Sequence, residues 1–97
     1  MTTENELEPL APETAKEMYH REREGEVAER TLQAHHYRLV HFIRWCDEND
    51  LDNLNELSGR ALHEYRLWRK DDGDLKAVSL RTQLQTLRVF IKFCERR

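Results

Sequence analysis

Glycine, proline and cysteine are scarce in this 97-residue chain, which contains three, two and two of them. Few Gly and Pro residues leave few places for tight turns, and 38% hydrophobic residues in a chain of this length support one modest core. No apolar run is long enough to cross a membrane, and no run alternates apolar and polar residues as a half-buried strand does. The first residues are acidic, unlike the basic start of a secretion signal. We therefore expect one soluble, intracellular, helical domain.

Recognisable catalytic and cofactor motifs are also absent. The chain has no glycine-rich phosphate loop, no GxSxG and no HExxH, and its carboxylates are scattered over expected outer faces. Cys46 and Cys94 fall on apolar helix faces, which favours buried thiols over a disulfide or a metal pair. The five histidines show no ligand spacing with these cysteines. We expect no metal, no cofactor and no catalysis in this segment.

Acidic residues are concentrated at the start of the chain. Residues 1–29 contain nine acidic and three basic residues, whereas residues 30–97 contain ten acidic and thirteen basic residues. The net charge of −3 therefore hides a basic remainder, which indicates a polyanionic partner. Arginine outnumbers lysine by twelve to four, which suits bidentate contacts to phosphates, although a GC-rich genome would produce the same bias.

The last helix, expected from about Ser79 to the chain end, has the clearest two-sided pattern. At about 100° per residue, one face collects the apolar residues Leu80, Leu84, Leu87, Phe90, Ile91 and Cys94. Another face collects four cations and one amide: Arg81, Gln85, Arg88, Lys92 and Arg96. Each cation of such a stripe can neutralise a phosphate and release its counterion. The pattern predicts one buried face and one phosphate-binding face.

The segment from Thr31 to Cys46 repeats this pattern 48 residues earlier. Leucine, phenylalanine, isoleucine and cysteine recur at matching positions, and Arg44 corresponds to Lys92. Either a duplication or the small alphabet of amphipathic helices accounts for the match, since two copies are fewer than a repeat array needs. In both cases we expect the two helices to turn similar cationic faces outward on one common surface.

The rest of the chain is expected to add a tail and shorter helices. Residues 1–11 are expected to be a disordered acidic tail, followed by one domain at residues 12–97. Helices are expected from Pro12 to about Glu24, from Ala28 to about Glu48 and from Gly59 to about Lys70. A leucine-bearing connector with a serine N-cap precedes the third helix, and an Asp-rich turn follows it. The expected fold is all-α, a small orthogonal four-helix bundle with a short connector.

These helices are expected to differ in the clarity of their buried faces. The first is expected to dock loosely, with an inner edge of Ala15, Met18 and Tyr19. The second is expected to bury Leu32, Leu39, Phe42, Ile43 and Cys46. Its outward side is expected to carry Arg30, Gln33, Tyr37, His41 and Arg44. The third is expected to bury Ala61, Leu62, Tyr65 and Trp68, while its mixed charges, Arg69 included, face solvent.

Two motifs at a fixed separation resemble a known family. The second helix carries Thr31, Leu32, His35, Leu39, Phe42 and Trp45, and the last helix carries Ser79, Leu84, Leu87, Arg88 and Phe90. With the leucine-bearing connector between them, these motifs resemble the N-terminal core-binding domain of tyrosine recombinases, or phage-type integrases. Residues 52–84 are especially similar to integrase-type proteins of halophilic archaea. The chain departs from the pattern at His35, Ala28 and Ser79, where Tyr, Ser and Thr are common.

The resemblance implies a SAM-like four-helix core that closes one side of a clamp around duplex DNA. It also implies a first helix that can contact neighbouring recombinase subunits. In the family, a separate C-terminal domain bears the Arg, Lys, His and Tyr residues that cut and rejoin strands, and it is expected after residue 97. We therefore expect this chain to bind DNA for integration and recombination without catalysing it, in the cytoplasm at the nucleoid.

The expected contacts lie on the outer faces of the second and last helices. The candidates are Thr31, Gln33, Tyr37, Arg44, Arg81, Thr82, Gln85, Arg88 and Lys92. The cations are expected to set affinity through phosphates, while Gln33 and Gln85 could read base edges. One rival is a protein–protein interaction module that docks through the acidic first helix with exposed Val89 and Phe93. A second rival, a small enzyme, lacks the motifs that it would need.

Overall fold

Residues 9–96 are described in a computed structural model, and within them the chain is helical. The elements in order are α1 (Pro12–Arg23), α2 (Glu29–Glu48), the short 3₁₀ helix η2 (Leu54–Glu56), α3 (Gly59–Gly73) and α4 (Ala77–Arg96). The expected all-α four-helix fold is confirmed. None of the helices in this part of the chain is long and apolar enough to span a membrane.

The helix ends follow from local chemistry. Pro12 occupies the first turn of α1, where its missing N–H costs nothing, and Gly25 takes a positive φ of 85° just after the helix. The Ser58 hydroxyl caps α3 by accepting the Ala61 N–H at 3.1 Å, as expected. α3 runs three residues further than predicted because the helical hydrogen bonds continue to Gly73, and Asp74 in the left-handed region (φ 50°) then ends it.

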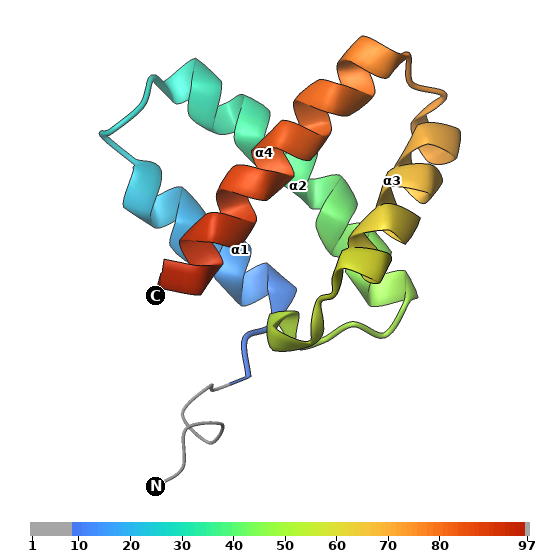
Figure 1. The fold of residues 1–97 in the computed structure, drawn as a ribbon. Helices are drawn as coiled ribbons and strands as arrows, with labels where there is room; N and C mark the ends of the chain where they lie inside the picture. Colours follow the sequence, from blue (N-terminus) through green and yellow to red (C-terminus); the bar gives the residue numbers. More distant parts are fainter. Residues whose placement is uncertain (1–8, 97) are drawn as a thin grey trace, which may run out of the picture.

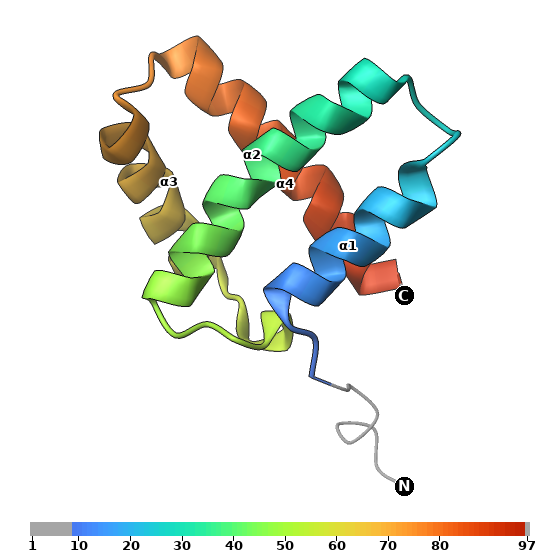
Figure 2. The ribbon, with the colours of Figure 1, turned by 180° about the vertical axis from the view of Figure 1, so that it is seen from behind.

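α2 and α4 cross each other at the centre of the molecule. α4 lies in front of α2 in Figure 1, and α2 lies in front when the molecule is seen from behind in Figure 2. α1 and α3 flank the crossing on opposite sides (Figure 1). The N-terminal ends of α2 and α4 lie along one edge, and the start of α1 lies with η2 at the other edge. The Cα extents of 47 × 33 × 17 Å fit such a flat, two-layered arrangement.

Aromatic rings from all four helices form the core. Phe42 of α2 lies edge-on to Tyr65 of α3 at 5.3 Å and to Phe90 of α4 at 6.3 Å between ring centroids. Tyr19 of α1 lies edge-on to Phe90 at 5.6 Å. These four side chains are at most 2% exposed. Trp45, 4% exposed, also belongs to this core, although it was not among the residues predicted to be buried on α2. It is buried because α3 covers that flank of α2.

The start of the chain is held more firmly than expected. Leu10 is 6% exposed, its N–H donates to Asn53 Oδ1 at 3.1 Å, and its carbonyl accepts the Leu54 N–H at 2.8 Å. The predicted tail is therefore wrong for residues 9–11, whereas residues 1–8 lie outside the described residues. The loose docking of α1 is also wrong, since Tyr19 is among the most buried side chains, while Met18 is 39% exposed.

The sequence match between the second and last helices has a structural counterpart. Adding 48 to the bounds of α2 gives residues 77–96, which are the bounds of α4. Two pairs of matching positions contact each other at the crossing. Arg38 Nη1 donates to Thr86 Oγ1 at 3.0 Å, and Phe42 packs on Phe90. Contact between equivalent positions places an approximate two-fold axis through the crossing.

Candidate nucleic-acid interface

The outer face of α4 carries exposed cations without carboxylate partners. Arg81, Gln85, Arg88 and Lys92 are all exposed. Within the described part of the chain, none of the three cations forms an ion pair. Thr82 is exposed beside them and donates its hydroxyl to the Val78 carbonyl at 3.1 Å. α4 therefore presents positive charge that is free to meet an anionic ligand.

The outer face of α2 carries mainly polar candidates. Thr31, Gln33 and Tyr37 are exposed, as predicted, and Tyr37 is 64% exposed. The Tyr37 ring lies edge-on to His41 at 5.1 Å, which holds the ring against the helix and leaves its hydroxyl accessible. These three residues lie in the N-terminal half of α2, near the edge that α2 shares with α4 (Figure 1).

Arg44 is the one candidate whose charge is already paired. Its Nη2 and Nη1 lie 2.6 and 3.2 Å from the two carboxylate oxygens of Asp72, and its guanidinium stacks 4.6 Å from the Trp68 ring centroid. Glu48 adds a second carboxylate at 3.7 Å. The bidentate bond to Arg44 holds the pKa of Asp72 below its usual value. The outward placement of Arg44 and His41 was wrong because α3 packs over this part of α2.

Arg69 was expected to face solvent and is instead 4% exposed. Its Nε donates to Gln83 Oε1 at 2.7 Å, and its Nη1 lies 3.1 Å from Asp72 Oδ2. Asp72 thus serves two arginines, Arg44 from α2 and Arg69 from α3. A buried guanidinium is tolerated because both a carboxylate and an amide oxygen satisfy it. This cluster holds α2, α3 and α4 together and so fixes how α4 is presented.

The folded structure lowers the pKa of three histidines. Burial lowers the pKa of His35, whose Nδ1 shares a hydrogen bond with the Tyr19 hydroxyl at 3.0 Å, and it also lowers the pKa of His36. Burial first, and then Arg69 and Arg44, lower the pKa of His41. Arg44 can only donate, so His41 Nδ1 accepts from it at 3.2 Å, and protonating that nitrogen would break the bond.

We expect these histidines to make folding acid-sensitive. A pKa lowered by folding means that the unfolded chain binds protons more readily, so stability is full above the usual value of 6.5 and falls as the pH drops through it. Urea unfolding at pH ~7 and ~5 should give a smaller free energy of unfolding at the lower pH, before carboxylates titrate. H41Q should reduce this loss. An unchanged midpoint between the two values would contradict the assignment.

The two cationic faces do not share one surface. α2 and α4 pack through their apolar sides, so their outer faces turn toward opposite sides of the flat molecule (Figures 1 and 2). The predicted common surface is therefore wrong for the outward faces as a whole. The two helices do begin along the same edge of the molecule, but their starts lie at opposite ends of that edge because the helices cross as an X (Figure 1).

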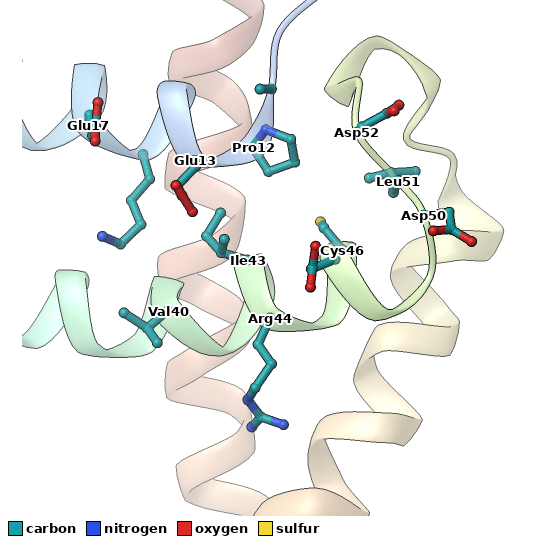
Figure 3. Close-up of a pocket in the computed structure, with 13 residues that line it drawn as sticks. Pro12, Glu13, Glu17, Val40, Ile43, Arg44, Cys46, Asp50, Leu51 and Asp52 are labelled. Carbon is teal, nitrogen blue, oxygen red and sulfur yellow. The ribbon is translucent and has the colours of Figure 1, made fainter.

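A groove on the other side of α2 has the opposite charge. It measures about 800 Å³ and lies between the start of α1, the second half of α2 and the segment after α2 (Figure 3). Val40, Ile43 and Leu51 line it together with two cations, Lys16 and Arg44, and five carboxylates: Glu13, Glu17, Asp47, Asp50 and Asp52. Figure 3 shows Arg44 extending from α2 away from α1. The carboxylates disfavour a nucleic-acid backbone at this groove.

Two further expectations concern apolar and thiol side chains. Val89 and Phe93 are half-buried, not exposed, since Phe93 packs edge-on to Tyr19 at 5.4 Å. Together with Met18 they line a smaller hollow between α1 and α4. Cys46 is buried and Cys94 half-buried, and neither forms a disulfide. Burial raises the pKa of Cys46 to about 12, which makes it a packing residue.

Comparison with known proteins identifies the family to which this four-helix domain belongs. Residues 19–97 match the family described as the phage integrase N-terminal SAM-like domain. The crystal structure of the N-terminal domain of a phage integrase/site-specific recombinase from Haloarcula marismortui superposes with a TM-score of 0.86 at 30% identity, over 92% of this chain and 85% of that one. No curated protein matches the chain. The profile match spans most of the chain and the structural match covers nearly all of it, so the chain belongs to the N-terminal SAM-like domain family of the phage integrases.

Proposed function

We propose that this domain binds double-stranded DNA and forms one side of the clamp of a site-specific tyrosine recombinase. The observation that carries the proposal is the exposed row of Arg81, Arg88 and Lys92 on α4, none of which pairs with a carboxylate within residues 9–96. Membership of the integrase family indicates DNA as the partner. The unpaired cations of α4 can bind its phosphates. Released counterions would provide most of the affinity.

The residues fall into two roles. Arg81 and Arg88, and Lys92 further along α4, would contact phosphates and set affinity and register. Gln85 lies between the cations on the same face, and a glutamine can form a bidentate pair with adenine in the major groove. From α2, Thr31 lies on the same side of the helix as Arg38, which contacts α4, and would contact the duplex near the edge where both helices begin. Gln33 and Tyr37, predicted as contacts, lie on the outer face of α2 that turns away from α4, so we expect them to contribute less. Arg44 would contribute least, because Asp72 already neutralises it.

In this proposal strand cleavage belongs to residues outside this segment, and the domain acts at the nucleoid. α1 would contact neighbouring recombinase subunits. The groove beside α1 supports that role, because its apolar floor includes the half-exposed Val40 and it lies away from the edge where α2 and α4 begin. The same groove would be available to another protein if the domain were only an interaction module.

Amide chemical-shift mapping tests the proposal. The ¹⁵N-labelled chain would be titrated at low salt with a duplex of ~20 base pairs, and we expect shifts in the first half of α2 and along the outer face of α4. A weak, sequence-independent complex is sufficient, since non-specific affinities of about 10⁻⁴ to 10⁻⁶ M are measurable. Shifts restricted to α1 and the acidic groove, or none at all, would contradict DNA binding. Self-association without DNA would favour the interaction module.

A further inference from the structure

Arg38 of α2 reaches the crossing with α4. Its Nη1 donates to Thr86 Oγ1 of α4 at 3.0 Å, and Thr86 is itself 4% exposed, so this bond ties the guanidinium to a fixed hydroxyl. Thr86 Oγ1 in turn lies 3.4 Å from the Thr82 carbonyl, to which it can donate. Arg38 was absent from the predicted contacts because its position depends on the crossing of α2 with α4, which the pattern of a single helix does not show.

Arg38 has no carboxylate partner within the described residues. Arg44 and Arg69 share Asp72, whereas the hydrogen bond to Thr86 is the contact that the structure gives Arg38. The positive charge of Arg38 also lowers the pKa of the neighbouring His35, although burial is the larger cause. A guanidinium has five donors, so a half-buried arginine held by one hydroxyl keeps donors and charge for an anion.

The side chains around Arg38 on its exposed side are small. One and two turns earlier on the same side of each helix lie Ala34 and Thr31 of α2, and Thr82 and Ser79 of α4. Thr31, Ser79 and Thr82 are exposed, and none of these four positions is acidic. Small side chains permit close approach of a polymer backbone, and hydroxyls are common phosphate ligands.

The cations and the hydroxyl side chains of α4 lie on opposite flanks of Gln85. At about 100° per residue, Arg81 and Arg88 lie on one flank of Gln85, and Thr82, Thr86 and Ser79 lie on the other. Arg38, bound to Thr86, therefore stands on the flank opposite to Arg81 and Arg88. A helix in the major groove has one phosphate backbone on each flank.

We propose that Arg38, oriented by Thr86, binds a phosphate of the DNA strand opposite to the one that Arg81 and Arg88 contact. This inference rests on the proposed function and makes it more specific: α4 lies in the major groove with Gln85 toward the base edges. Arg81 and Arg88 hold one backbone, and Arg38 with the hydroxyl of Ser79 holds the other. The domain would then distinguish double-stranded from single-stranded DNA, because it contacts the phosphates of both strands.

A comparison of double-stranded with single-stranded DNA tests this assignment. Binding of the 97-residue chain to a labelled duplex of ~20 base pairs, and to one of its single strands, would be measured by fluorescence anisotropy over a salt series. R38M should weaken duplex binding about tenfold and lower the salt slope by about 0.9, with single-strand affinity within about twofold of the wild type. T86V, which keeps the charge, should weaken duplex binding less and leave the slope unchanged.

Matched variants separate the possible failures. R66M removes an exposed arginine of α3 and should change neither affinity by more than about twofold. R38K should keep the salt slope. If R38M loses equal affinity for both DNA forms, or loses none, the role of Arg38 is overturned while DNA binding stands. If the wild-type chain binds neither form, the proposed function is overturned. If R38M does not fold, the Arg38 Nε–Hε resonance of the wild-type chain should shift on adding duplex and not on adding single strand, and no shift would overturn the proposal.

Discussion

Replacing Arg81 and Arg88 together with alanine is expected to weaken duplex binding by about 100-fold at low salt. Each charge-assisted contact to a phosphate contributes roughly tenfold, and neither arginine is engaged elsewhere in the described structure. Because both side chains are exposed, circular dichroism should show unchanged helicity and the melting temperature should move little. Fluorescence anisotropy with a labelled duplex at low salt measures the loss.

A matched double variant controls for net charge. R60A with R66A removes the same charge from exposed positions on α3 and should weaken binding only slightly, through long-range electrostatics that salt screens. Wild-type affinity in the R81A/R88A chain would remove α4 from the contact surface. Equal losses in both double variants would mean that net charge, and not a defined face, governs binding.

Truncation of Phe42 to alanine is expected to cause the largest loss of stability, about 3 to 5 kcal/mol. Phe42 is fully buried and contacts the rings of Trp45, Tyr65 and Phe90. It joins three helices at the crossing, and the remaining rings cannot collapse into the space that it leaves. Small domains have only about 5 to 15 kcal/mol in total, so F42A should be marginally folded. Urea unfolding followed by circular dichroism would measure the change.

Leu67 offers the control for this truncation. It is also a large apolar residue, but it is 48% exposed on α3, so L67A should change the free energy of unfolding by about 0.5 kcal/mol or less. A loss below about 1 kcal/mol for F42A would show that the four-helix aromatic core does not hold the fold together.

Helical periodicity predicted the elements well because each helix carries its own pattern. The bounds of α2 and the Ser58 cap depend on residues within a few positions of one another, which sequence spacing displays directly. Trp45 was not among the residues predicted to be buried, and Arg69 was misplaced, for the opposite reason. Their burial depends on the packing of α3 against α2 and α4, and the period of a single helix does not reveal which of its flanks a neighbour covers.

The candidate site was predicted in part for the same reason. The outward cations of α4 follow from its period, and they are exposed as expected. The pairing of Arg44 with Asp72 joins residues from two helices, so the sequence could not show that this charge is neutralised. Arg38 was missed because its importance comes from the crossing. One indication of this contact was present in the sequence, the 48-residue offset between the two helices. Arg38 and Thr86 are matching positions under that offset, and they contact each other at the approximate two-fold axis.

The central claim is that the cations of α4 meet a duplex, and the salt dependence of binding tests it most directly. For the wild type, the logarithm of the association constant plotted against the logarithm of salt concentration should fall with a slope of about −0.9 for each phosphate contacted. The slope of the R81A/R88A chain should be shallower by about 1.8, the share of two contacts. A flat plot for the wild type, or identical slopes for the two proteins, would contradict the account.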